Sequence, residues 1–222
     1  MEETKNMIDN STIDKIMESQ QMSELIDRNS NPLVYGVPIP HKEGVVEQSK
    51  RRMFEGLRKY LESQDFDGFM VLFEKTQKLE AFFLLNNHLP LDKKTAAELF
   101  KDAWAFAAIN YKHVEQCKKC FAEYADLMMD KKEKEIYNNL PDEVKIFRGT
   151  RVDPSVDNGI SWSLDKKIAK KFMIMPNGIF HEINLDGQDK VLTPNLREKI
   201  VPKNKIICYL NDRKEKEVIY WD

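Results

Sequence analysis

The spacing of apolar residues changes along the chain, from a helical period before about residue 140 to a strand period after it. In the first part apolar positions recur every three or four residues, as they do on one face of a helix. In the last part short β-branched runs alternate with pairs of turn-forming Asn, Asp and Gly. The pattern predicts an α+β protein, with a helical N-terminal region followed by a small domain that contains sheet.

The helical region is divided by a stretch rich in proline. Residues 1–44 form an N-terminal segment, in which residues 29–40 hold Pro and Gly and predict an extended connector. Before the connector, helical spacing is shown by Ile13, Ile16, Met17 and Ile26. Residues 45–139 are predicted as an α-helical domain with a break at 86–90. Residues 99–107 after that break leave little polar face, so we expect this helix at the centre of a bundle.

Residues 140–222 form the third predicted domain, in which strands and turns dominate. One amphipathic helix is expected over about residues 163–173, with Ala169 and Phe172 facing inward. Its exposed side is predicted to carry Lys166, Lys167, Lys170 and Lys171. A solvated helix face is the default interpretation of these lysines, and an acidic partner or nucleic acid is the alternative.

Two polar clusters lie on strand-like runs of this domain. Arg148 and Gly149 belong to the first, and Ser161 and Ser163 flank Trp162 in the second. Because successive side chains of a strand point to opposite faces, the two serines are predicted to share a face, with Trp162 on the other.

A third cluster holds two carboxylates near the C-terminal end. Glu215 and Glu217 flank Lys216 on a run that also has a strand pattern, so they are predicted to share a face. In chain order the arginine, the Ser-x-Ser pair and the Glu-x-Glu pair resemble the arginine–serine–glutamate signature of mono-ADP-ribosyltransferases. The resemblance covers roughly residues 144–222 and none of the helical region.

This resemblance implies an ADP-ribosyltransferase-like catalytic domain built as a β-sandwich of two packed sheets. It implies transfer of ADP-ribose from NAD, used as a substrate, to an arginine side chain of a protein target, with release of nicotinamide. It also suggests a bacterial or bacteriophage toxin or effector, with an inhibitor or host factor as a further partner. The cofactor-binding residues would be Arg148, Gly149, Ser161 and Ser163, and the catalytic residues would be Glu217 and Glu215.

The residue types suit this chemistry. Cleavage of the nicotinamide–ribose bond leaves positive charge on the sugar in the transition state, which a carboxylate such as Glu217 can stabilise. The fixed donors of Arg148 can grip phosphate or ribose oxygens, and Gly149 beside it leaves room for a ligand to approach the backbone. Ser161 can fix the ribose through a short hydroxyl. By the resemblance, Glu215 would engage the guanidinium of the acceptor arginine.

Composition is that of a soluble globular protein. The chain has 222 residues, of which 41% are hydrophobic and 32% are charged. Its three cysteines, a low and odd number, indicate a reducing compartment. Neither a secretory signal nor an apolar run of membrane-spanning length is seen, so a cytoplasmic protein without a membrane partner is expected. The net charge of −2 gives no general attraction to nucleic acid, although local basic patches leave nucleic acid open as a substrate.

Two further candidates have simpler interpretations. Cys117 and Cys120, with His113 one helical turn upstream, could form a three-ligand metal site. Two buried thiols on an amphipathic helix are the favoured interpretation, and no metal is expected. His181 beside Glu182 could be a catalytic base, but a structural histidine is favoured.

The clusters themselves also have structural interpretations. Taken singly, Arg148 is typical of a strand-edge arginine, and the mixed-charge run 213–217 is typical of a solvated turn. Two other functions therefore stay open: an NAD-cleaving enzyme whose acceptor is water or nucleic acid, and a non-catalytic binding module on the same fold. Release of nicotinamide from NAD would distinguish an enzyme from a binding module.

Overall fold

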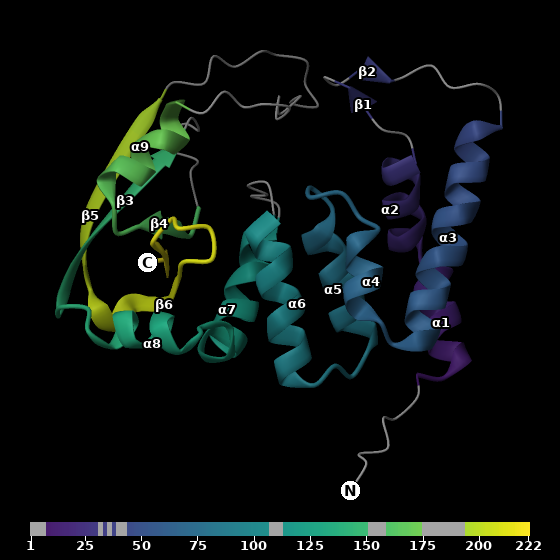
Figure 1. Cartoon of the computed structure of the whole chain (residues 1–222), viewed down its shortest axis with the longest axis horizontal. Helices are drawn as coiled ribbons and strands as arrows, with labels where there is room; N and C mark the ends of the chain where they lie inside the picture. The colour runs from purple at the N-terminus through teal and green to yellow at the C-terminus, as the bar shows by residue number, and fades with distance from the viewer. Residues whose placement is uncertain are drawn as a thin grey trace, which may run out of the picture. The chain divides into compact units, whose positions relative to one another are not determined.

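The computed structural model folds into two compact units, Met1–Ala108 and Ile109–Asp222. The residues that the structure describes are 8–30, 33–34, 37–38, 44–106, 113–150, 159–174 and 194–222. Within each unit, helices and strands that are distant in sequence are in contact (Figure 1).

The first unit is helical, as its sequence pattern predicts. Its helices are α1 (Asn10–Met17), α2 (Gln20–Ser30), α3 (Val45–Ser63), α4 (Phe66–Val71), α5 (Lys78–His88) and α6 (Lys93–Phe106). The positions expected to be apolar in the first two helices are buried. In the predicted connector, β1 (Leu33–Val34) and β2 (Val37–Pro38) form a short antiparallel pair. Within the described residues, every helix falls short of the length or apolarity that a membrane span requires.

The most completely buried helix of this unit is α5, not the following helix. Leu79 to Leu85 are all buried in α5, which contacts α1, α2, α4 and α6. In contrast, Glu98 and Asp102 give α6 an exposed polar side. Within residues 99–107, Leu99, Phe100 and Ala103 are buried as expected, but α5 is the helix that contacts the larger number of neighbouring helices. A helix surrounded by others has no solvent face to keep polar.

In its described residues, the second unit combines a sheet with three α-helices. Its helices are α7 (Val114–Met128), α8 (Lys131–Asn138) and α9 (Lys166–Ile174), and its strands are β3 (Glu143–Thr150), β4 (Ser161–Ser163), β5 (Asn195–Pro202), β6 (Ile206–Leu210) and β7 (Glu217–Tyr220). Both α7 and α8 contact β6, so these two helices belong with the sheet. The predicted boundary near residue 140 marks the change from helix to strand, but the compact unit begins earlier, at Ile109.

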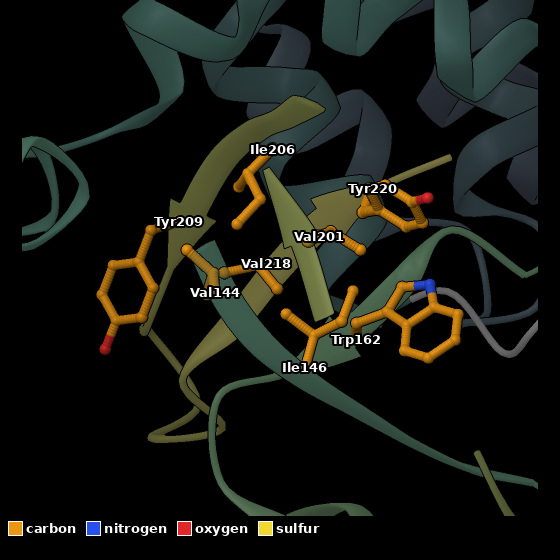
Figure 2. Close-up of a cluster of buried hydrophobic side chains, with 8 residues drawn as sticks. All are labelled: Val144, Ile146, Trp162, Val201, Ile206, Tyr209, Val218 and Tyr220. Carbon is orange, nitrogen blue, oxygen red and sulfur yellow. The ribbon is translucent and has the colours of Figure 1, made fainter. Parts of the chain in front are cut away.

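The five strands form one antiparallel sheet in the order β5-β3-β4-β7-β6. The unit is therefore α+β, as predicted. The packed second sheet that the resemblance implies is not among the described residues of this unit. One face of the sheet carries a hydrophobic cluster, drawn in Figure 2, of Val144, Ile146, Trp162, Val201, Ile206, Tyr209, Val218 and Tyr220. On this face Trp162 packs edge-on against Tyr220, with ring centroids 6.0 Å apart.

Helix α9 lies against β3, β4 and β5 (Figure 1). Its first turn is supported by Asp165, whose carboxylate accepts the backbone N–H of Lys167 at 2.9 Å. Ala169 is buried as predicted, but Phe172 is 36% exposed, so the inward orientation expected for it is wrong. The lysines at positions 166, 167, 170 and 171 are exposed, as the amphipathic pattern predicts.

Candidate active site

The three polar clusters come together on three neighbouring strands. Strand β4 lies between β3 and β7, and its Ser163 pairs with Phe147 on one side and with Glu217 on the other. The chain therefore brings the arginine strand, the serine strand and the glutamate strand side by side, although about 70 residues separate the first from the last.

Ser161 and Glu217 form a direct hydrogen bond at the centre of this arrangement. The Oγ of Ser161 donates to Oε1 of Glu217 at 2.5 Å. The register places Ser161, Ser163 and Glu217 on one face and Trp162 on the other, which confirms the faces predicted for β4. Glu217 is only 5% exposed. A buried carboxylate requires hydrogen-bonding partners, and a hydroxyl donor is one of those found here.

Arg148 approaches the same serine from the opposite face of the sheet. Pairing of Phe147 with Ser163 places the side chain of Arg148 on the face of Trp162. Its Nη1 nevertheless reaches β4 and donates to the carbonyl oxygen of Ser161 at 2.7 Å. Arg148 is 6% exposed, so the alternative of a solvated strand-edge arginine is wrong. Ser161 thus connects the guanidinium, through its carbonyl, with the carboxylate, through its hydroxyl.

Two glycines near Arg148 allow close packing, Gly159 against the guanidinium and Gly149 against helix α9. A Cβ at Gly159 would lie 1.9 Å from Nη2 of Arg148, so only glycine permits this position of the guanidinium. A Cβ at Gly149 would lie 1.8 Å from the carbonyl oxygen of Ala169 in α9. The space at Gly149 that was expected to admit a ligand is therefore occupied by helix α9. Close contact between helix and strand is the reason for glycine there.

Ser163 supports the loop that carries the second carboxylate. Its Oγ donates to the carbonyl oxygen of Glu215 at 2.8 Å and accepts the backbone N–H of Asp165 at 3.0 Å. The serine thereby ties the end of β4 to the start of α9 and to the glutamate loop. This contact is a supporting one, made through the main chain of Glu215 rather than its carboxylate.

Strand β7 begins only at Glu217, so the prediction that Glu215 lies on the same strand is wrong. Glu215 lies in a turn, between two lysines whose φ angles are 58° at Lys214 and 47° at Lys216. Residues other than glycine rarely adopt this left-handed conformation, and such strain is common at functional sites. Both carboxylates nevertheless lie near the same guanidinium. Nη2 of Arg213 is 2.8 Å from Oε2 of Glu215 and 3.6 Å from Oε2 of Glu217.

Further contacts fix this turn and were not anticipated from the sequence. The backbone N–H of Asn211 donates to Oε1 of Glu133, a buried residue of α8, at 2.6 Å. The Oδ1 of Asn211 accepts the backbone N–H of Lys216 at 3.0 Å, and Lys216 pairs with Asp165 at 3.1 Å. A capping box with Asp130 also holds Glu133 at the start of α8. In the sequence, the Asp-x-x-Glu spacing of the capping box is the feature that indicates a fixed position for Glu133.

The environment of Glu215 changes its acidity. Burial raises the pKa of the Glu215 carboxyl above its usual value, the nearby Arg213 opposes this shift, and the charge of Glu217 adds to it. A carboxylate with a raised pKa takes up a proton more readily than an ordinary glutamate. Glu215 is therefore suited to accept a proton from a neighbouring group.

The other candidates do not join this cluster. Burial raises the pKa of the Cys117 thiol to about 12 and that of Cys120 to about 12, so both are protonated, buried thiols near neutral pH. The Nδ1 of His113 lies 2.7 Å from Oε1 of Gln116. In the described segments, His, Cys, Asp and Glu do not gather in a group of three or more that could hold a metal ion. His181 and its neighbouring carboxylate lie outside the described residues.

No protein-family model, curated protein or solved structure matches this chain.

Proposed function

We propose that the second unit is an NAD-dependent mono-ADP-ribosyltransferase that modifies an arginine side chain of a protein. The observation that carries this proposal is the partly buried Ser161–Glu217 hydrogen bond, next to a second carboxylate that holds a guanidinium. We extend the proposal to the fold, taking the five-stranded sheet as one of the two sheets of an ADP-ribosyltransferase sandwich. A bacterial or bacteriophage effector fits the resemblance on which the proposal also rests.

In this proposal Glu217 is the carboxylate that stabilises the cleavage of NAD. Its Oε1 is fixed by Ser161, so the charge is held in one orientation before the substrate arrives. The bond between nicotinamide and C1′ of the ribose breaks, and its electron pair leaves with nicotinamide. Positive charge then develops on the sugar, and a preorganised, buried carboxylate stabilises it more strongly than water does.

Glu215 would bind the acceptor arginine. Its carboxylate forms an ion pair at 2.8 Å with the guanidinium of Arg213, and this contact supports the assignment. A guanidinium must lose a proton when its nitrogen bonds to carbon. The raised pKa of the Glu215 carboxyl favours transfer of that proton to it.

Glu215→Gln tests this division of roles. The variant should still release nicotinamide from NAD in the absence of an acceptor, because Glu217 and Ser161 are unchanged. Transfer to agmatine, a small guanidine, should fall by roughly 10²-fold, the usual scale for loss of one catalytic acid–base group. Nicotinamide and modified agmatine are both measured by chromatography. Equal loss of both activities would contradict a separate role for Glu215.

Arg148→Lys tests the binding of NAD. Arg148 lies on the face opposite to Glu217 and acts on the proposed site through its bond to the carbonyl of Ser161. Lysine keeps the charge but not the planar set of donors that holds this carbonyl. Loss of one charge-assisted hydrogen bond costs about 1.5–3 kcal/mol, so the dissociation constant should rise at least about tenfold. Titration calorimetry with NAD measures it, with Arg51→Lys as a control on an exposed arginine of the first unit. An unchanged constant would remove Arg148 from the NAD site.

The same assays distinguish the competing functions. Release of nicotinamide without any modified acceptor would indicate water as the acceptor. Binding of NAD without release would indicate a binding module on this fold.

A further inference from the structure

Arg213 occupies a distinctive position beside the two proposed catalytic acids. Its Nη2 lies 2.8 Å from Oε2 of Glu215 and 3.6 Å from Oε2 of Glu217, and its side chain is 39% exposed. Glu217 is fixed on its other oxygen by Ser161. A guanidinium from the chain itself thus lies where the proposed reaction requires the guanidinium of a protein target.

We infer that Arg213 is a self-modification site, at which the enzyme transfers ADP-ribose from NAD to its own chain. The inference rests on the proposed function, because it uses the same two carboxylates and the same substrate. It goes beyond that function because it names an acceptor within this protein, the guanidinium of Arg213.

The position of Arg213 in the turn favours transfer within one molecule. The turn is closed by a hydrogen bond from the backbone N–H of Lys214 to the carbonyl oxygen of Asn211 at 2.9 Å, directly beside Arg213. A nucleophile held next to the reacting centre has an effective concentration far above that of a separate molecule. The partial exposure of Arg213 leaves room for the product to extend into solvent.

Other arginines in the described part of the chain have different surroundings. Arg148 is buried and donates to the carbonyl of Ser161. The guanidinium of Arg197 lies over the ring of Trp162, 5.4 Å from its centroid. Arg28 and Arg51 form ion pairs with Glu80 and Glu55 of the first unit. Among the described ion pairs, those of Arg213 are the ones that reach both proposed catalytic acids.

The reaction balances without a further reagent. A guanidinium nitrogen of Arg213 bonds to C1′ of the nicotinamide ribose, and the bond from C1′ to the ring nitrogen of nicotinamide breaks. The electron pair of the broken bond leaves with nicotinamide. The proton lost by the guanidinium passes to Glu215 and then to water. The products are the modified chain, nicotinamide and one proton.

The experiment follows the intact mass of the full chain during incubation with NAD. The wild-type chain should gain one ADP-ribose, and fragmentation should locate it on Arg213. Because the transfer is within one molecule, its first-order rate constant should not change when the protein is diluted. Arg213→Lys should lose this mass gain, whereas Arg51→Lys, which changes another ion-paired arginine, should gain it at the wild-type rate.

Agmatine separates failure of this inference from failure of the proposed function. If the wild-type chain modifies agmatine but gains no mass, self-modification is refuted and the transferase stands. A mass gain that persists at the wild-type rate in Arg213→Lys, or a rate constant that rises with protein concentration, also refutes the inference. If Arg213→Lys still modifies agmatine while its self-modification is lost, Arg213 is the acceptor and not part of the catalytic machinery. If the wild-type chain neither releases nicotinamide nor modifies agmatine, the proposed function fails, and the inference fails with it.

Discussion

Glu217→Gln should lower the release of nicotinamide from NAD by roughly 10²-fold or more, the scale observed when one preorganised electrostatic contact is removed. Glutamine has nearly the same shape as glutamate and can still accept the hydrogen bond from Ser161. The substitution therefore removes the negative charge while it retains most of the local packing. A loss of rate can then be attributed to electrostatic stabilisation of the sugar cation.

Glu198→Gln is the matched control for this charge change. Glu198 is also an ion-paired carboxylate of the same sheet, with Lys145 and Lys166 as its partners, but it lies on β5. Its substitution should leave the release of nicotinamide within about a factor of two of wild type. The ion pairs of Glu198 are exposed and screened by solvent, so their loss should not unfold the second unit. If Glu217→Gln and Glu198→Gln release nicotinamide at the same rate as wild type, Glu217 is not the catalytic carboxylate.

Gly149→Ala should destabilise the second unit by at least about 1–3 kcal/mol, the usual cost of forcing extra volume into a packed interior. The new Cβ would lie 1.8 Å from the carbonyl oxygen of Ala169 and 2.7 Å from its carbonyl carbon. Both are backbone atoms of α9, so the clash can be relieved only if the helix moves away from β3. The midpoint of urea unfolding, followed by circular dichroism, measures the effect.

Gly56→Ala provides a comparison in which the added methyl group meets a flexible atom. Its Cβ would lie 3.3 Å from Cδ1 of Leu72, which can rotate away, and the position is inside α3. Alanine is favoured over glycine within a helix by roughly 0.5–1 kcal/mol, so the variant should be neutral or slightly stabilised. Equal destabilisation by the two substitutions would show that contact with α9 is not what requires glycine at position 149.

Local sequence patterns predicted the elements of this protein well. The helical spacing of Ile13, Ile16 and Met17 corresponds to α1, and the expected break at 86–90 falls where α5 ends and α6 has yet to begin. Strand alternation correctly gave Trp162 to the hydrophobic face. These features depend on residues close in sequence, for which the periods of helix and strand are sufficient.

The candidate site depended on contacts that no local pattern contains. Alternation placed Glu215 and Glu217 on one strand, but a left-handed residue at Lys216 ends the strand pattern between them. The mixed charges of residues 213–217 do not show in the sequence that the guanidinium of Arg213 lies near both acids. Gly149 was assigned to a ligand because the sequence does not show that α9 lies against β3. Long-range packing determines each of these features.

The anchor of the glutamate turn on α8 has a practical consequence for anyone who isolates the second unit of this protein. A fragment that starts where the strands start, near residue 140, would lack Glu133 and both helices that contact β6. The backbone N–H of Asn211 would lose its carboxylate acceptor, and the edge of the sheet would lose its helical cover. The smallest autonomous piece should therefore include α7, and its first residue belongs ahead of Val114.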